Sequence, residues 1–164
     1  MSFKFSADEV LQMAERIERN GARFYREAAA REAFRRTQEL LLSLAAMEEG
    51  HEKAFAEMRS ALSAEEREPV VHDPMDEGTL YLRAYADRRI FDAMGDPARD
   101  LTGEEREEDI LRLGIQAEKD SIVFYTGLKD LVPERLGRDR IDRIIREEMG
   151  HFATLTELLA EALL

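Results

Sequence analysis

The stretch Ala46–Phe55 reads AMEEGHEKAF, and the stretch Arg146–Leu155 reads REEMGHFATL. Each contains a glutamate that is followed three residues later by a histidine, at Glu48–His51 and again at Glu148–His151. Residues three apart on an α-helix lie only about 60° apart around the helix axis. Each glutamate and its histidine can therefore direct both side chains at one point, as two ligands of a metal ion must.

The two motifs belong to a longer internal repeat. When the chain is shifted by one hundred positions, Glu18 falls on Glu118 and Tyr25 falls on Tyr125. A single Glu-x-x-His motif is weak evidence in a chain this rich in glutamate, because its ordinary interpretation is an exposed pair on a helix. Two copies, at equal spacing from two Glu-x6-Tyr segments, favour a metal site. Otherwise they would be costly buried charges on apolar helical faces.

Apolar residues recur at helical spacing over the first third of the chain. Ser6 and Glu9 match a capping box, which predicts the start of a first helix that extends to about residue 30. A second helix is expected to begin near residues 31–34 and to end near residue 62.

The last third of the chain repeats this arrangement. Thr102–Glu105 matches a second capping box and predicts the start of a third helix. A turn over 132–137 separates it from a fourth helix, which is expected from about residue 138 to the C-terminus. Between the halves, a shorter helix is expected through residues 80–94.

These elements predict an all-α protein that forms a single domain over residues 1–164. Its fold class is a four-helix bundle of two antiparallel helical hairpins, joined by a long crossover at 63–102 that contains a short extra helix. In such a bundle the repeated residues converge on one layer of the core.

Composition limits the function further. The chain of 164 residues has a net charge of −12, three histidines and no cysteine. The negative charge argues against nucleic acid or an anionic membrane as partner. The lack of cysteine excludes disulfides, thiolate catalysis and iron–sulfur clusters. No apolar run is long enough to span a membrane and the first residues do not resemble a signal peptide, so a cytoplasmic location is expected.

Four carboxylates and two imidazoles suit two iron or manganese ions, because four glutamate charges balance two divalent cations. The predicted ligands are Glu18, Glu48, His51, Glu118, Glu148 and His151. Tyr25 and Tyr125 follow two of these glutamates by two helical turns and can hydrogen-bond a ligating carboxylate. The alternative for each tyrosine is a core ring with its hydroxyl at the rim.

Other polar residues near the motifs are expected to lie outside the site. Glu15, one turn before the first predicted ligand, is interpreted as a surface charge rather than an extra ligand. Glu49, Glu52 and Glu147 are expected to point away, since successive helical residues are about 100° apart. His72 lies in a proline-flanked segment and is expected to be solvated.

The six residues, on this order of helices, resemble the rubrerythrin branch of the ferritin-like diiron-carboxylate superfamily. The resemblance spans almost the whole chain and is strongest in ERIERNGARFY, MEEGHEKAF, AEKDSIVFY and IIREEMGH. It implies two bridging ligands, Glu48 and Glu148. It also implies that Glu18 and His51 serve one ion, and that Glu118 and His151 serve the other.

Several features depart from related families. Many rubrerythrins carry a rubredoxin-like domain with four cysteines, which this chain lacks, so it resembles a stand-alone erythrin-type domain. Ile115 stands where typical rubrerythrins have an additional glutamate, which leaves redox-linked ligand exchange open. The crossover is also longer than usual. Bacterioferritin shares the six ligands, but Glu49 occupies the position of its haem-binding methionine, so neither haem nor a storage cage is expected.

The resemblance implies an iron protein active in oxidative stress, which reduces hydrogen peroxide or oxidises Fe(II) with peroxide or oxygen. It implies electrons from a separate donor protein, a homodimer, and no catalytic residue beyond the metal ligands. Two alternatives remain: a non-catalytic iron or oxygen sensor or metal-handling protein, and a purely structural bundle. Apolar residues of the crossover are candidates for a dimer interface or for covering the bundle: Leu80, Tyr81, Tyr85 and Phe91.

Overall fold

A computed structural model describes residues 6–31, 37–69 and 97–164 of the chain. The four long helices are α1 (Ala7–Ala29), α2 (Gln38–Ser60), α5 (Glu107–Leu128) and α6 (Arg138–Ala162). Three short 3-10 helices are η2 (Glu65–Arg67), η3 (Pro97–Asp100) and η4 (Glu134–Leu136). The described residues include no strand, and no helix among them is long and apolar enough to cross a membrane.

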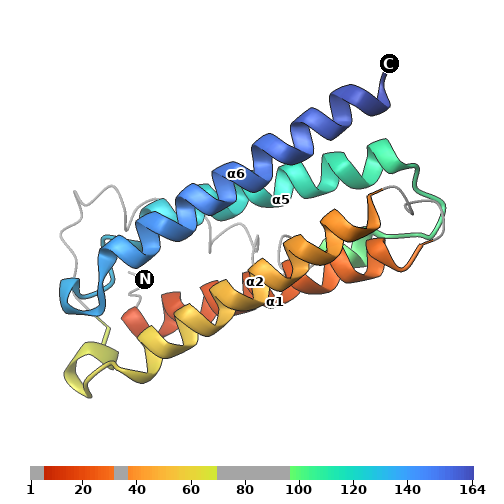
Figure 1. Cartoon of the computed structure of the whole chain (residues 1–164). Coiled ribbons are helices and arrows are strands. Elements are labelled where there is room, and N and C mark those ends of the chain that lie inside the picture. The colour runs from red at the N-terminus through yellow and green to blue at the C-terminus, as the bar shows by residue number, and fades with distance from the viewer. Residues whose placement is uncertain (1–5, 32–36, 70–96) are drawn as a thin grey trace, which may run out of the picture.

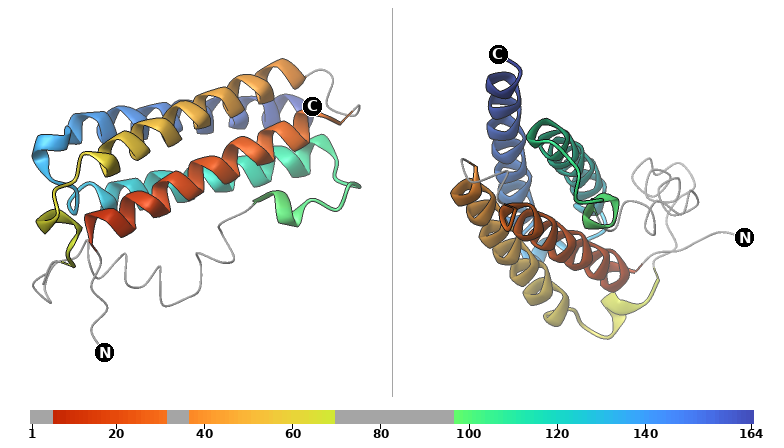
Figure 2. Two further views of the ribbon diagram at one scale, coloured as in Figure 1. Left: turned by 90° about the horizontal axis from the view of Figure 1, so that it is seen from below. Right: turned by 90° about the vertical axis from the view of Figure 1, so that its right-hand side faces the viewer.

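The long helices form two hairpins that face each other. Helix α1 packs mainly on α2, and α5 packs mainly on α6 (Figure 1). Helix α2 ends at the end of the bundle where η2 lies, whereas α5 begins at the opposite end, near η3 (Figure 2). Helices α2 and α5 therefore run in the same direction, which confirms the predicted bundle of two hairpins joined by a long crossover. The short helix expected at 80–94, His72 and the apolar crossover residues lie outside the described part.

The start of α1 is as the sequence predicts. The amide of Glu9 donates to Ser6 Oγ at 3.2 Å, and the amide of Ser6 donates to Glu9 Oε2 at 2.8 Å. Both hydrogen bonds of the capping box are present, so donors that the first turn of a helix leaves free are satisfied.

The predicted starts of α2 and α5 are early by several residues. The amide of Thr102 donates to Glu105 Oε1, which is one of the two hydrogen bonds of the expected capping box, but α5 begins only at Glu107. Gly103 has φ of 98°, a left-handed conformation that a right-handed helix cannot include. Helix α2 begins at Gln38, whose Nε2 donates to Ala29 O at 2.9 Å and so closes the end of α1.

The apolar core is divided into two clusters. The first surrounds Phe55 and Phe124, both fully buried, and the second surrounds Phe24 and Leu41. Along every long helix, the residues between the two clusters are those of the repeated polar motifs. A buried polar layer therefore crosses the middle of the bundle, with apolar side chains above and below it.

Candidate metal centre

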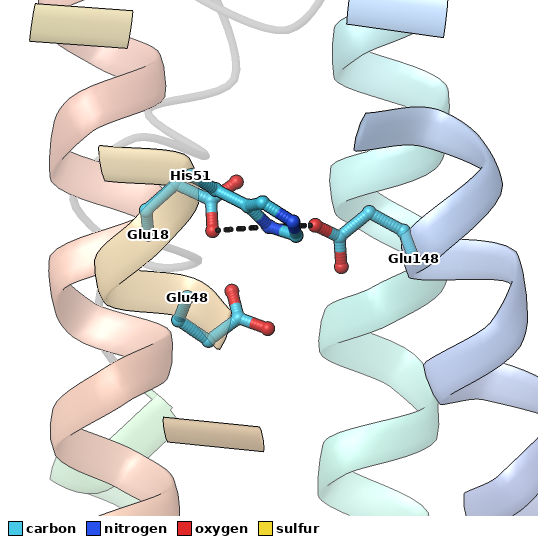
Figure 3. A group of neighbouring side chains, drawn as sticks. All are labelled: Glu18, Glu48, His51 and Glu148. Carbon is cyan, nitrogen blue, oxygen red and sulfur yellow. Dashed lines mark ion pairs between the residues drawn. The ribbon is translucent and has the colours of Figure 1, made fainter. Parts of the chain in front are cut away.

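All six predicted ligands lie in this polar layer, and none is more than 5% exposed. Helix α1 contributes Glu18, α2 contributes Glu48 and His51, α5 contributes Glu118, and α6 contributes Glu148 and His151. Figure 3 shows four of them, Glu18, Glu48, His51 and Glu148, which point toward one another from both hairpins.

The side chains form two overlapping groups. Ligand atoms of Glu18, Glu48, His51 and Glu148 lie within 4.8 Å of one another, and so do those of Glu48, Glu118, Glu148 and His151. Glu48 and Glu148 belong to both groups. The two shared residues are those that the family resemblance implies as bridging ligands, and the bridging role itself stays a prediction.

Each imidazole faces carboxylates from both hairpins. His51 Nδ1 lies 2.8 Å from Glu148 Oε1 and 3.4 Å from Glu18 Oε2 (Figure 3). His151 Nδ1 lies 3.3 Å from Glu148 Oε2 and also 3.3 Å from Glu48 Oε1. The two rings stack with their centroids 5.9 Å apart. Glu148 thus presents one oxygen to each histidine.

Of the two alternatives for the tyrosines, the structure shows hydrogen bonds to carboxylates of the layer, and these bonds cross between the hairpins. Tyr25 of the first hairpin donates to Glu118 Oε1, and Tyr125 of the second donates to Glu18 Oε1. Each bond fixes one oxygen of its carboxylate. The other oxygen is left to face the centre.

Several fully buried atoms of the layer make no hydrogen bond to the described residues, although some of them lie close to an oppositely charged group. They are Glu18 Oε2, Glu48 Oε1, both oxygens of Glu148, Nδ1 of His51, and both ring nitrogens of His151. A buried polar atom without a partner costs about 1–3 kcal/mol. Divalent cations would satisfy the oxygens and the Nδ1 atoms together, so the residues present fit a dinuclear metal site.

Burial and crowding alter the proton affinity of these groups. Burial, together with the charges of Glu48 and Glu148, holds the pKa of Glu18 well above its usual range. Burial also raises the pKa of Glu118 to about 8. For His51, burial acts in the opposite direction, but the contact with Glu148 outweighs it and raises the pKa to about 9. In the ion-free protein, these raised pKa values favour the protonated forms of Glu18, Glu118 and His51.

The stability of the ion-free protein should therefore fall as pH rises from about 5 to 9. Raised pKa values mean that the folded chain holds protons which the unfolded chain releases, so stability declines with pH. This applies to the carboxyls of Glu18 and Glu118 and to the imidazole of His51. The opposite contribution of Glu148, whose pKa is lowered, is confined to pH below its ordinary value of 4.5.

Thermal unfolding of chelator-treated protein between pH 5.5 and 8.5 measures this dependence. The iron-loaded protein is the control, because metal competes with protons for the same atoms and its binding strengthens as pH rises. A melting temperature of the ion-free protein that increases over this range would contradict the prediction.

Two expectations about neighbouring glutamates are wrong. Glu15 is not a surface charge: it is only 7% exposed, and its Oε1 lies 3.1 Å from Arg59 Nε of α2. Glu147 does not point away from the site, since its Oε2 lies 2.7 Å from His51 Nε2. In both cases the partner lies on a neighbouring helix. Spacing within one helix does not reveal such a partner.

The other two glutamates do point away, as predicted. Glu49 pairs with Arg26, and Glu52 Oε1 lies 2.7 Å from Arg19 Nη2. Ile115, at the position of the additional family glutamate, packs against the second apolar cluster.

An open pocket of about 340 Å³ lies beside the layer, between α2 and α6. Its lining residues are Met47, Gly50, His51, Ala54, Arg140, Arg143, Ile144 and Glu147. The contact between His51 and Glu147 forms part of its wall. Small molecules in solvent can thus approach one end of the polar layer.

Comparison with known proteins agrees with this geometry. A family model described as Rubrerythrin matches residues 9–159. A crystal structure from Thermotoga maritima, of a protein described as a candidate ferritin-like diiron-carboxylate protein, superimposes with a TM-score of 0.69. It is 24% identical, and the match covers 99% of each chain, which shows a ferritin-like fold. No curated protein matches. Because the family match covers nearly the whole sequence, the chain belongs to the rubrerythrin family.

Proposed function

We propose that this chain is a dinuclear iron protein that reduces hydrogen peroxide or oxidises Fe(II) with peroxide or oxygen. The observation that carries the proposal is the pair of overlapping ligand groups, which share Glu48 and Glu148. The atoms of these groups that lack hydrogen-bond partners also support it. The proposed ligands are Glu18, Glu48, His51, Glu118, Glu148 and His151.

The ligand chemistry favours two divalent ions of the iron or manganese type. Glutamate oxygen and imidazole nitrogen suit these metals, and four carboxylates balance the charge of two divalent cations. The family membership of the chain favours iron. The neighbouring crystal structure supports the same choice, because its protein is described as a diiron-carboxylate protein.

The chain's own residues would hold and shield the metals. Glu48 and Glu148 would contact both ions, while Tyr25 and Tyr125 keep the terminal carboxylates oriented. The apolar clusters on either side exclude bulk water from the layer. Bound ferrous iron would supply the two electrons that cleave the O–O bond of hydrogen peroxide. Two protons from solvent would complete the conversion of the peroxide to two water molecules.

The electrons for repeated turnover must come from another molecule. The chain has no cysteine for an iron–sulfur centre, and the polar layer is the one candidate redox site in its described part. We therefore include an external electron-donor protein in the proposal. Peroxide is small enough to use the pocket beside His51.

Anaerobic stopped-flow mixing tests the proposal. Protein loaded with Fe(II) should consume about one peroxide for every two ions oxidised, faster than the same concentration of free Fe(II) in buffer. With a chemical reductant present, peroxide consumption should continue over many cycles. A protein that binds iron but reacts no faster than free iron would overturn the enzymatic proposal. If the bound Fe(II) is oxidised once but peroxide consumption does not continue when a chemical reductant is present, the protein would be a sensor.

A further inference from the structure

The two histidines of the layer differ at the ring edge that faces away from the carboxylates. His51 Nε2 lies 2.7 Å from Glu147 Oε2. His151 Nε2 is buried and has no hydrogen-bond partner among the described residues. The two tyrosines, in contrast, behave alike, since each donates to the glutamate of the other half.

The asymmetry has an origin in the repeat. A shift of one hundred positions places Glu147 on Met47. Helices α2 and α6 are antiparallel (Figure 1), so the repeat predicts Met47 at the place beside His151 that corresponds to Glu147 beside His51. A thioether is only a weak acceptor and carries no charge. A methionine at that place offers His151 Nε2 no charged acceptor, in agreement with the lack of a hydrogen-bond partner for this atom.

We propose that Glu147 is a positioning residue that makes the two metal positions unequal, so that the ion served by Glu18 and His51 binds first. The ion served by Glu118 and His151 binds second. This inference rests on the proposed dinuclear site and concerns the order in which that site fills.

The physical basis is the orientation of the imidazole ring. When His51 Nε2–H donates to Glu147, the lone pair of Nδ1 is directed into the layer, and the carboxylate strengthens Nδ1 as a ligand. His151 can bind metal through Nδ1 only with an unsatisfied, buried N–H on the other side of its ring. Loss of such an outer hydrogen bond typically weakens metal binding about 10- to 100-fold.

The order of filling can be observed residue by residue with Zn(II), which is diamagnetic. We would add Zn(II) to ion-free, ¹⁵N-labelled protein and record the histidine ring signals by NMR, with His72→Gln used to remove those of the third histidine. The first equivalent should shift the ring signals of His51 and the second those of His151. This readout does not depend on activity.

Exchanging the two residues should reverse the order. Glu147→Met should weaken zinc binding at His51 by about 10- to 100-fold, and Met47→Glu should strengthen it at His151 by a similar factor. The double variant should fill the His151 position first. Glu147→Gln retains an acceptor for Nε2–H and should keep the original order.

Glu49→Met is the matched control. Glu49 is adjacent to Glu48 in sequence, as Glu147 is adjacent to Glu148. Because Glu49 pairs with Arg26, its substitution removes one negative charge without removing a contact to a histidine. The order should stay unchanged in this variant. Simultaneous filling in the wild type, or an unchanged order in Glu147→Met, would overturn the inference while leaving a two-ion site intact. A wild type that binds no zinc and no Fe(II) would overturn the site itself.

Discussion

Glu148→Ala should lower the metal content of the protein from about two ions per chain to none. Its two oxygens lie 2.8 Å from His51 Nδ1 and 3.3 Å from His151 Nδ1, and the residue belongs to both ligand groups. Removing it takes one ligand from each metal position and also leaves the two ions without a shared negative charge between them. Glu18→Ala, in contrast, removes a ligand from one group and should cost one ion.

Stability provides a second readout for the same variant. An ion that binds only the folded chain, at a hundredfold excess over its Kd, adds about 2.7 kcal/mol to the free energy of unfolding. The wild type should therefore show a large increase in melting temperature with Fe(II), which Glu148→Ala should lack.

Elemental analysis and anaerobic thermal unfolding would measure both effects. Glu49→Ala is the control, because Glu49 adjoins Glu48 in sequence but contacts Arg26 outside the layer. It should retain two ions and the full thermal shift. Two tightly bound ions in Glu148→Ala would show that the metals lie elsewhere.

The parts of this structure that the sequence predicts are those that depend on the period of a helix. Glu18 and Tyr25 are seven residues apart, two turns along one face, so both are buried at the same side of α1. The same reasoning applies to each Glu-x-x-His pair. Because the motif occurs once in each hairpin, the convergence of six residues follows from the antiparallel pairing of the helices.

The errors concern contacts between helices and the exact points where helices begin. Glu147 contacts His51 of α2, and the buried Glu15 pairs with Arg59 of α2. Neither partner is within one turn of its residue in sequence. The late start of α5 depends on the left-handed conformation of Gly103, which the capping pattern alone does not exclude.

Close packing around the layer is a further feature that spacing does not reveal. A Cβ atom added to Gly21 would lie 3.1 Å from Glu48 Oε2, which is tighter than ordinary contact. The glycine lets the carboxylate of Glu48 approach the backbone of α1. The sequence shows a glycine in a helix at this point, but only the packed hairpin gives a reason for it.

Phe55→Ala should lower the free energy of unfolding by about 3–5 kcal/mol, the typical cost of removing a buried aromatic ring. Phe55 is fully buried in the first apolar cluster, and its ring centroid lies 4.9 Å from that of Tyr125. The cavity left by the ring would adjoin the tyrosine that holds Glu18. The loss in stability should therefore be accompanied by weaker binding of the ion that Glu18 serves.

Denaturant unfolding of the ion-free protein isolates the packing effect from the metal effect. Val123→Ala is the control: Val123 is 45% exposed on α5, so its substitution should change stability by no more than about 0.5 kcal/mol. A loss below about 1 kcal/mol in Phe55→Ala would mean that the cluster collapses around the missing ring. A loss of about 3–5 kcal/mol with unchanged metal binding would instead show that the packing of the apolar cluster does not affect the metal site in the polar layer. Glu18 would then be held in place by Tyr125 and its own helix, without support from Phe55.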